Sequence, residues 1–156
     1  MEKPLYFAYG SNINLDQMRY RCPDAVVYGV GVLKNYELTF WGNWSRYGVA
    51  TVIPHPGTDV PVAVWEISAA DEQNLDRYEG WPHLYRKEDI EVAMNDGSVV
   101  TGMVYIMNET NMRPAYPSTS YYNTIATGYR SFRFDLAFLK AARDRTIDPE
   151  YRFKKL

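Results

Sequence analysis

The first third of the chain carries apolar side chains in the short runs that are typical of β-strands. Residues 5–9, 25–33, 37–41 and 47–53 are rich in β-branched and aromatic side chains, and Lys34-Asn35 and Gly42-Asn43 interrupt them. Because such turn residues commonly separate strands, the pattern predicts an opening strand followed by three more. The Pro-His-Pro-Gly run at 54–57 then predicts a turn, and the alternating stretch 61–67 predicts a further strand.

Helical spacing is confined to a few segments with clear boundary residues. Asn14 predicts the N-cap of a helix over 15–21, which ends before Pro23. Ser68, three residues before Asp71, resembles a capping box and predicts a helix that runs until Gly80. The sequence therefore places two short helices among strands rather than a regular alternation of the two.

The second half of the chain predicts one hairpin and then helices. Residues 85–93 and 99–107 flank an Asn-Asp-Gly run at 95–97, which is typical of a tight β-hairpin. Apolar spacing then predicts one helix from Ser118 or Thr119 to Tyr129 and another over 135–145. This order favours an α+β fold, with a curled mixed or antiparallel sheet or a small β-barrel and a few flanking helices.

Length and charge narrow the class of protein. The 156 residues, 46% of them apolar, predict a single domain over 1–148 with a C-terminal tail at 149–156. Basic and acidic residues number 17 and 19 and are well mixed, which disfavours nucleic acid and membrane surfaces as partners. Because Cys22 is the single cysteine and the N-terminus does not resemble a signal peptide, we expect a cytoplasmic protein without a disulfide.

Several common chemistries lack their residues. The Gly-x-Gly at 29–31 has Lys34 where a dinucleotide-binding fingerprint requires glycine. His55 and His83 are the only histidines, so neither a metal nor another cofactor is expected. Ser11 lacks the Gly-x-Ser-x-Gly context of a hydrolase nucleophile and has no evident base beside it.

The Tyr-Gly-Ser-Asn run at 9–12 is the first candidate for a binding site. A strand that ends at Gly10 and turns through Ser11 and Asn12 into a helix presents successive backbone N–H groups at one point. Such a loop is suited to bind a carboxylate or a phosphate, and glycine leaves room for the ligand. The plainer alternative is that Ser11 and Asn12 only cap a turn.

Glu79 is the candidate for acid–base chemistry. It falls in the last turn of the predicted helix, just before Gly80, where the helix dipole disfavours a negative charge. With Tyr78 and Trp81 as neighbours, partial desolvation should raise its pKa further, which suits a general acid and base near neutral pH. The alternative is an exposed glutamate at a helix end.

Three motifs in this order resemble the γ-glutamylcyclotransferase-like (AIG2-like) family over about residues 5–140. They are YGSN at 9–12, LDRYEG at 75–80 with a following Tyr-Arg, and PSTSYYNTIATGY at 117–129. Ile13 stands where the family usually has leucine, and the segment after Gly128 differs from the usual continuation. The resemblance implies a γ-glutamylcyclotransferase-like fold.

The resemblance also implies roles for individual residues. It assigns proton transfer to Glu79. It assigns binding of the glutamyl end of the substrate, or a place in the pocket, to Tyr9, Gly10, Ser11, Asn12, Ile13, Tyr85, Tyr105 and Tyr121. The implied reaction is cyclisation of a γ-glutamyl amide through its own α-amine, with release of 5-oxoproline and an amine or amino acid. It needs no cofactor, because the reacting groups belong to one molecule.

Two other functions stay open at this point. The substrate can instead be a γ-glutamyl-amine or a larger γ-glutamylated carrier, or the loop can belong to a non-enzymatic module that binds a small carboxylate. A buried Glu79 with a high pKa favours an enzyme, whereas a Glu79 paired with Arg77 or Arg86 favours binding alone. The sequence leaves open whether the chain is a monomer or a homodimer, and whether Trp41, Trp44 and Trp81 line the pocket or the core.

Overall fold

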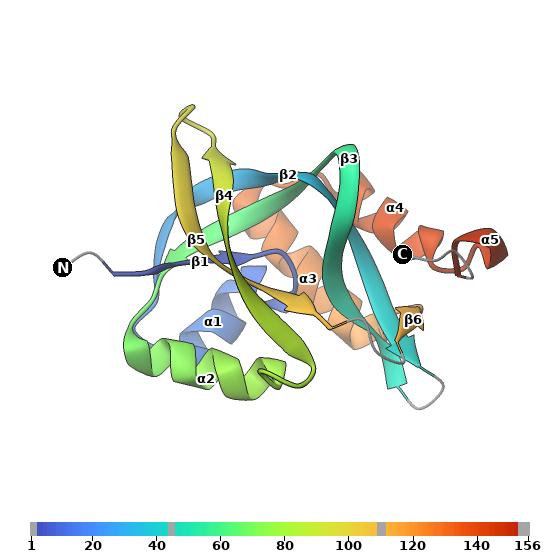
Figure 1. Cartoon of the computed structure of the whole chain (residues 1–156), viewed down its shortest axis with the longest axis horizontal. Helices are drawn as coiled ribbons and strands as arrows, with labels where there is room; N and C mark the ends of the chain where they lie inside the picture. Colours follow the sequence, from blue (N-terminus) through green and yellow to red (C-terminus); the bar gives the residue numbers. More distant parts are fainter. Residues whose placement is uncertain (1–2, 44–45, 109–111, 153–156) are drawn as a thin grey trace.

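The sheet closes into a small mixed barrel (Figure 1). The computed structural model describes residues 3–43, 46–108 and 112–152. Its strands follow the order β3-β1-β5-β4-β2, and β2 pairs again with β3 to close the ring. The strands are β1 Leu5–Ala8, β2 Val26–Asn43, β3 Arg46–Glu66, β4 Tyr85–Met94 and β5 Val99–Met107, and β6 Arg113–Pro114 adds to β2. β1 and β5 are parallel and the other pairs are antiparallel.

Helices flank the barrel on two sides (Figure 1). The short turn η1 Ser11–Ile13 leads into α1 Leu15–Arg21, which lies with α2 Ala69–Glu79 at one end of the barrel. α3 Thr119–Phe132, α4 Leu136–Arg145 and α5 Pro149–Arg152 follow the last strand. The predicted α+β class, with a small barrel and flanking helices, is confirmed. Within the described residues no helix is long and apolar enough to cross a membrane.

The predicted cap residues act as the sequence indicates. The Asn14 side chain accepts a hydrogen bond from the Gln17 N–H at the start of α1. Ser68 and Asp71 form the reciprocal capping box of α2, and Gly80 ends that helix in the left-handed conformation, with φ of 66°. These local signals were readable because each depends on hydrogen bonds to neighbours in sequence.

The strand boundaries in the first half were predicted wrongly. The runs 25–33 and 37–41 belong to the single strand β2, and 47–53 and 61–67 belong to the single strand β3. The turn residues at 34–35 and 54–57 produce a paired irregularity instead of an end: Asn35 takes a positive φ and its side chain accepts a hydrogen bond from the Gly57 N–H. Pairing resumes beyond it, because both strands depart from the ladder at the same place.

The C-terminal helices contact two parts of the N-terminal half, with α3 packed on the loop after β1 and α5 bonded to β2. α3 packs so closely on η1 that a Cβ at Gly128 would lie 2.7 Å from the Ile13 carbonyl carbon. α5 begins the segment that the sequence assigned to a tail, and its Tyr151 hydroxyl donates to Glu37 on β2 at 3.2 Å. The loop after β1 is therefore fixed between the barrel and α3.

Candidate active site

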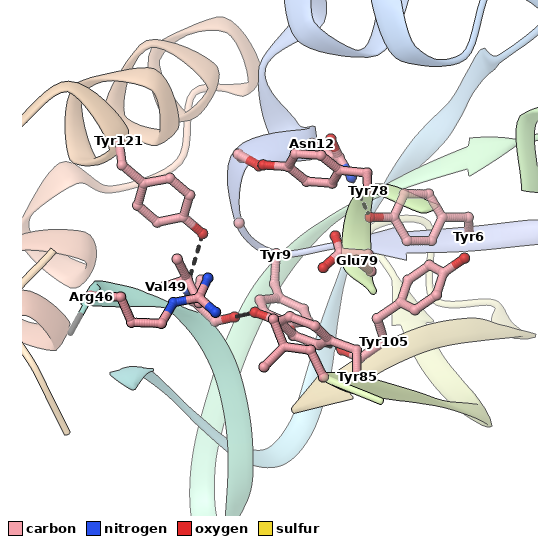
Figure 2. A pocket seen from close by; sticks show the side chains of 14 residues that line it. Tyr6, Tyr9, Asn12, Arg46, Val49, Tyr78, Glu79, Tyr85, Tyr105 and Tyr121 are labelled. Atoms are coloured by element: carbon pink, nitrogen blue, oxygen red, sulfur yellow. Dashed lines mark hydrogen bonds between the residues drawn. The ribbon is translucent and has the colours of Figure 1, made fainter. Parts of the chain in front are cut away.

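A cavity opens where the YGSN loop, the end of α2 and the barrel strands meet (Figure 2). Its volume is about 150 Å³. Cavities of this size hold a molecule as large as benzene, so it suits one small ring or a curled short chain. The lining residues come from five parts of the chain: Tyr6, Tyr9, Gly10, Ser11, Asn12, Arg46, Val49, Ala50, Tyr78, Glu79, Leu84, Tyr85, Tyr105 and Tyr121.

The YGSN loop forms one wall. β1 ends at Ala8, and η1 turns the chain so that the Ile13 and Asn14 N–H groups bond back to Gly10 and Ser11. Among the described residues, the N–H groups of Ser11 and Asn12 have no protein acceptor, as is usual at the start of a helical turn. These two donors sit in a cavity wall, which is the arrangement an anion needs.

Gly10 keeps the space in front of the loop open. A Cβ at this position would lie 3.0 Å from the Ala50 Cβ and 3.6 Å from the Tyr121 hydroxyl, both of which belong to the cavity wall. A side chain here would therefore crowd the opposite wall.

Three hydrogen bonds hold Asn12, two to its side chain and one to its backbone. Its amide N–H donates to the Tyr6 hydroxyl at 2.9 Å, and its side-chain oxygen accepts from Arg21. Its backbone carbonyl accepts from the Trp65 indole N–H at 3.2 Å. With these partners the loop keeps one conformation before any ligand binds.

Glu79 carries the only carboxylate among the described residues that line the cavity, and the pKa of this side chain is raised to about 7. Burial is the main cause, because removal from water disfavours the charged form, and the nearby Arg21 guanidinium opposes the shift. The predicted direction is confirmed, although burial rather than the helix dipole accounts for it. At neutral pH Glu79 is therefore divided between its acid and base forms.

Glu79 has none of the partners that would neutralise it permanently. Within the described ranges no hydrogen bond or ion pair involves its carboxylate. Arg77 donates instead to Asn74, and Arg86 pairs with Glu88 at 2.7 Å. Of the two arrangements that the sequence left open, this one favours acid–base chemistry.

Three of the cavity tyrosines donate their hydroxyl protons to the protein. Tyr9 donates to the Tyr105 carbonyl and Tyr85 to the Ala50 carbonyl, each at 2.6 Å. Tyr105 donates to the Asp76 carboxylate, also at 2.6 Å. Burial raises the pKa of all three hydroxyl groups, so they stay neutral and fix the shape of the wall.

Two other tyrosines accept hydrogen bonds and keep their own protons available. The Tyr121 hydroxyl accepts from the Ala50 N–H at 2.9 Å, and the Tyr6 hydroxyl accepts from Asn12 (Figure 2). A phenol that accepts one bond can still donate one. Burial raises both pKa values, so each keeps its proton at neutral pH and can offer it to a ligand oxygen.

The structure gathers all but one of the sequence-predicted site residues at this cavity. Glu79, Tyr9, Gly10, Ser11, Asn12, Tyr85, Tyr105 and Tyr121 line it. Ile13 does not: it is fully buried under α3 and supports the loop from behind. The prediction that Ile13 itself binds the ligand therefore has no contact to support it.

Sequence reasoning missed Tyr6, Tyr78 and Arg46. Tyr6 lies on the face of β1 that lines the cavity, and the alternation of side chains along a strand could have indicated it. Arg46 reaches the cavity only because β3 closes the barrel. Of the tryptophans in question, Trp41 is buried in the core and Trp81 is 44% exposed with the Lys87 ammonium over its ring, so neither lines the cavity. Trp44 lies outside the described residues.

Other chemistries find no support at this cavity. Ser11 shares a hydrogen bond with the Tyr78 hydroxyl at 3.1 Å, and His55 bonds to Thr58 on the surface. His83 is exposed, and neither histidine lines the cavity, so Ser11 has no histidine base beside it. In the part of the chain that the structure describes, no group of three or more His, Cys, Asp or Glu side chains is arranged to hold a metal ion.

A closed barrel with a cavity that holds an unpaired carboxylate and spare hydroxyl donors is typical of an enzyme, and the chain as a whole is similar to known proteins. The family model described as "Gamma-glutamyl cyclotransferase, AIG2-like" matches residues 6–123. The bovine gamma-glutamylcyclotransferase is 32% identical, with 98% of this chain and 84% of that protein covered. The human gamma-glutamylcyclotransferase is also 32% identical, over 81% of this chain and 70% of that protein.

Solved structures agree with this. A gamma-glutamyl cyclotransferase superimposes with a TM-score of 0.81 at 28% identity, over 99% of this chain and 94% of the other. The chain belongs to the gamma-glutamyl cyclotransferase, AIG2-like family. It is accordingly an enzyme of the γ-glutamylcyclotransferase type, as the sequence predicts, and the non-enzymatic alternative is not supported.

Proposed function

We propose that this cavity cyclises a γ-glutamyl amide with Glu79 as the proton-transfer group. The observation that carries the proposal is the Glu79 carboxylate, which lines the cavity, forms no hydrogen bond or ion pair among the described residues and has a pKa raised to about 7. A group with this pKa accepts and returns protons readily near neutral pH.

The loop holds the substrate in the curled form that the reaction needs. The N–H groups of Ser11 and Asn12 bind the α-carboxylate of the glutamyl group, and the space in front of Gly10 admits its carbon chain. The α-nitrogen then lies close to the γ-carbonyl carbon of the same molecule. Such an intramolecular arrangement contributes up to about 7–11 kcal/mol of rate enhancement in favourable cases.

Glu79 moves the protons between the two nitrogens. Its carboxylate takes a proton from the α-ammonium group, and the resulting amine attacks the γ-carbonyl carbon. When the amide C–N bond breaks, the protonated Glu79 gives the proton to the departing nitrogen. The ring nitrogen carries two hydrogens after the attack and loses one of them through Glu79 to the departing amine, which leaves as an ammonium ion. The products are 5-oxoproline and a free amine, and the enzyme returns to its starting form.

The spare tyrosine protons stabilise the charge that develops during attack. The γ-carbonyl oxygen becomes negative in the transition state and needs donors that are already in position. Tyr121 and Tyr6 supply them, since each hydroxyl accepts a bond from the protein and has a proton to give. Tyr9, Tyr85 and Tyr105 shape the pocket, because their protons are already committed.

The test measures 5-oxoproline release from γ-glutamyl-alanine, γ-glutamyl-ε-lysine and glutathione. We expect release from one of them by the wild type and a loss of about 10²- to 10⁴-fold in Glu79→Gln, the range for a general acid–base group. Glu91→Gln removes an exposed carboxylate of β4 and serves as the matched control.

Each outcome separates the candidate functions. A folded Glu79→Gln protein with near wild-type rates would refute the role of Glu79. No release from any of the three substrates would favour a larger γ-glutamylated carrier as the substrate. The cytoplasmic location and the choice between monomer and homodimer stay predictions.

A further inference from the structure

Arg46 is the one cation among the described residues that line the cavity, and it has no anionic partner there. It is the first residue of β3 and pairs with Asn43 of β2 through the backbone. Its side chain is exposed, so it stands at the opening of the cavity rather than in its depth. The proposed reaction makes no use of this charge.

Arg46 and Glu79 approach the cavity from different sides. Figure 2 shows the Arg46 side chain extending from β3 toward the cavity, on the side of Val49 and Tyr121. Glu79 lies across the cavity, beside Tyr6. The wall thus carries one positive and one negative group, separated by the tyrosine-lined space.

The size of the cavity decides which part of the substrate meets Arg46. About 150 Å³ accommodates one small ring, which the curled glutamyl group fills. The group attached to the γ-nitrogen must therefore extend toward the opening. In that direction it meets the exposed guanidinium of Arg46.

We propose that Arg46 binds the carboxylate of the departing amino acid. The inference rests on the proposed function and narrows its substrates to γ-glutamyl amides of α-amino acids, in preference to γ-glutamyl amides of simple amines. A guanidinium offers paired N–H donors that match the two oxygens of a carboxylate. Arg46 is thus a specificity-determining residue and takes no part in proton transfer.

The competing use of Arg46 makes a different prediction. If it bound the α-carboxylate of the glutamyl group, every γ-glutamyl substrate would depend on it equally. If it binds the departing group, only substrates with a carboxylate on that group depend on it. Two substrates that differ in this carboxylate alone separate the two cases.

γ-Glutamyl-alanine and γ-glutamyl-ethylamine form that pair. We expect the wild type to prefer γ-glutamyl-alanine in kcat/KM, and Arg46→Gln to reduce this preference about tenfold, the low end for a hydrogen bond to a charged group at an exposed position. The change should lie mainly in KM, and Arg46→Lys should recover part of it. Arg130→Gln, which removes an exposed cation of α3, should keep the wild-type preference.

An unchanged ratio of the two kcat/KM values in Arg46→Gln would overturn the inference, as would an equal loss for both substrates. Dissociation constants measured on Glu79→Gln, with and without Arg46→Gln, provide the same comparison without turnover. Absence of 5-oxoproline from both substrates would refute turnover of these small γ-glutamyl amides, whereas these affinities would still decide the role of Arg46.

Discussion

Two carboxylates of α2, Asp76 and Glu79, stand one helical turn apart and have opposite surroundings. Asp76 accepts a hydrogen bond from Tyr105 at 2.6 Å and pairs with the Lys87 ammonium at 2.9 Å. Glu79 faces the cavity with neither kind of partner in the described structure. A difference of three positions on one helix thus separates a carboxylate with structural partners from the carboxylate that we propose for proton transfer.

The comparison indicates that the chemical role of a carboxylate on this helix depends on whether the fold gives it hydrogen-bond and ion-pair partners. Both side chains have the same acid group, and both lie in the second half of the same capped helix. Asp76 gains stability from partners that hold its charge, whereas Glu79 loses solvation without compensation. The following three predictions test this contrast, from the largest expected effect to the smallest.

The pH dependence of activity should follow Glu79 and not Asp76. Because the reaction needs the base form of a group with a pKa of about 7, kcat/KM should fall below that pH and be about 100-fold lower at pH 5 than on the plateau. Asp76→Asn should keep the same midpoint. A profile that stays flat between pH 5 and pH 8 in the wild type would contradict the assignment.

The two substitutions should change stability in opposite directions at pH 8. The raised pKa of Glu79 means that the folded state holds this proton more tightly than the unfolded state. The stabilisation that this bound proton contributes is therefore fully present below about pH 4.5 and is lost as the pH rises through about 7. Glu79→Gln removes this loss, which is on the order of 2 kcal/mol, while Asp76→Asn should destabilise by about 1–3 kcal/mol through its lost partners.

Urea denaturation at pH 4.5 and pH 8 measures both effects. The advantage of Glu79→Gln over the wild type should appear at pH 8 and shrink at pH 4.5, where Glu79 is protonated in the folded state and about half protonated in the unfolded state. If the unfolding free energy of Glu79→Gln relative to the wild type did not rise between pH 4.5 and pH 8, the Glu79 carboxyl would not be desolvated in the folded protein.

The same contrast extends to the two tyrosines that bond to the Ala50 backbone. Tyr85 donates to its carbonyl, and Tyr121 accepts from its N–H, so each Phe substitution breaks one hydrogen bond of the same residue. Only Tyr121→Phe also removes a spare proton. We expect it to lower kcat/KM roughly tenfold, less than for a sole oxyanion donor because Tyr6 stays in place, and Tyr85→Phe to act mainly on stability.

Steady-state kinetics and thermal unfolding of the two variants provide the comparison. Similar losses of stability with dissimilar losses of kcat/KM would support the spare-proton assignment. Equal losses of kcat/KM would indicate that both hydroxyls serve only to shape the wall.

Local signals made much of the fold and the site predictable. The caps at Asn14 and Ser68, the end of α2 at Gly80 and the hairpin around Gly97 depend on neighbours in sequence. The position of Glu79 at a helix end follows from the same signals. The direction of its pKa shift was predicted from the helix dipole and from partial desolvation, and burial is the main cause in the structure.

Long-range contacts explain what the sequence did not reveal. Local turn residues in β2 and β3 gave a wrong number of strands, because the pairing of the two strands continues past Asn35 and Gly57. Arg46 joins the cavity through barrel closure, and no local pattern marks it. Which tyrosines keep a free proton also depends on partners such as Ala50, far away in sequence.

The place of Arg46 at the start of β3 has an evolutionary consequence. The pairing of β2 and β3 holds the barrel along most of the length of both strands, and Arg46 belongs to its last pair, with Asn43. Exchange of this residue leaves the carboxylate of α2 and the loop after β1 untouched. Related proteins can therefore change their substrate preference by substitutions at this end of the β2–β3 hairpin, while the residues proposed for ring closure stay the same.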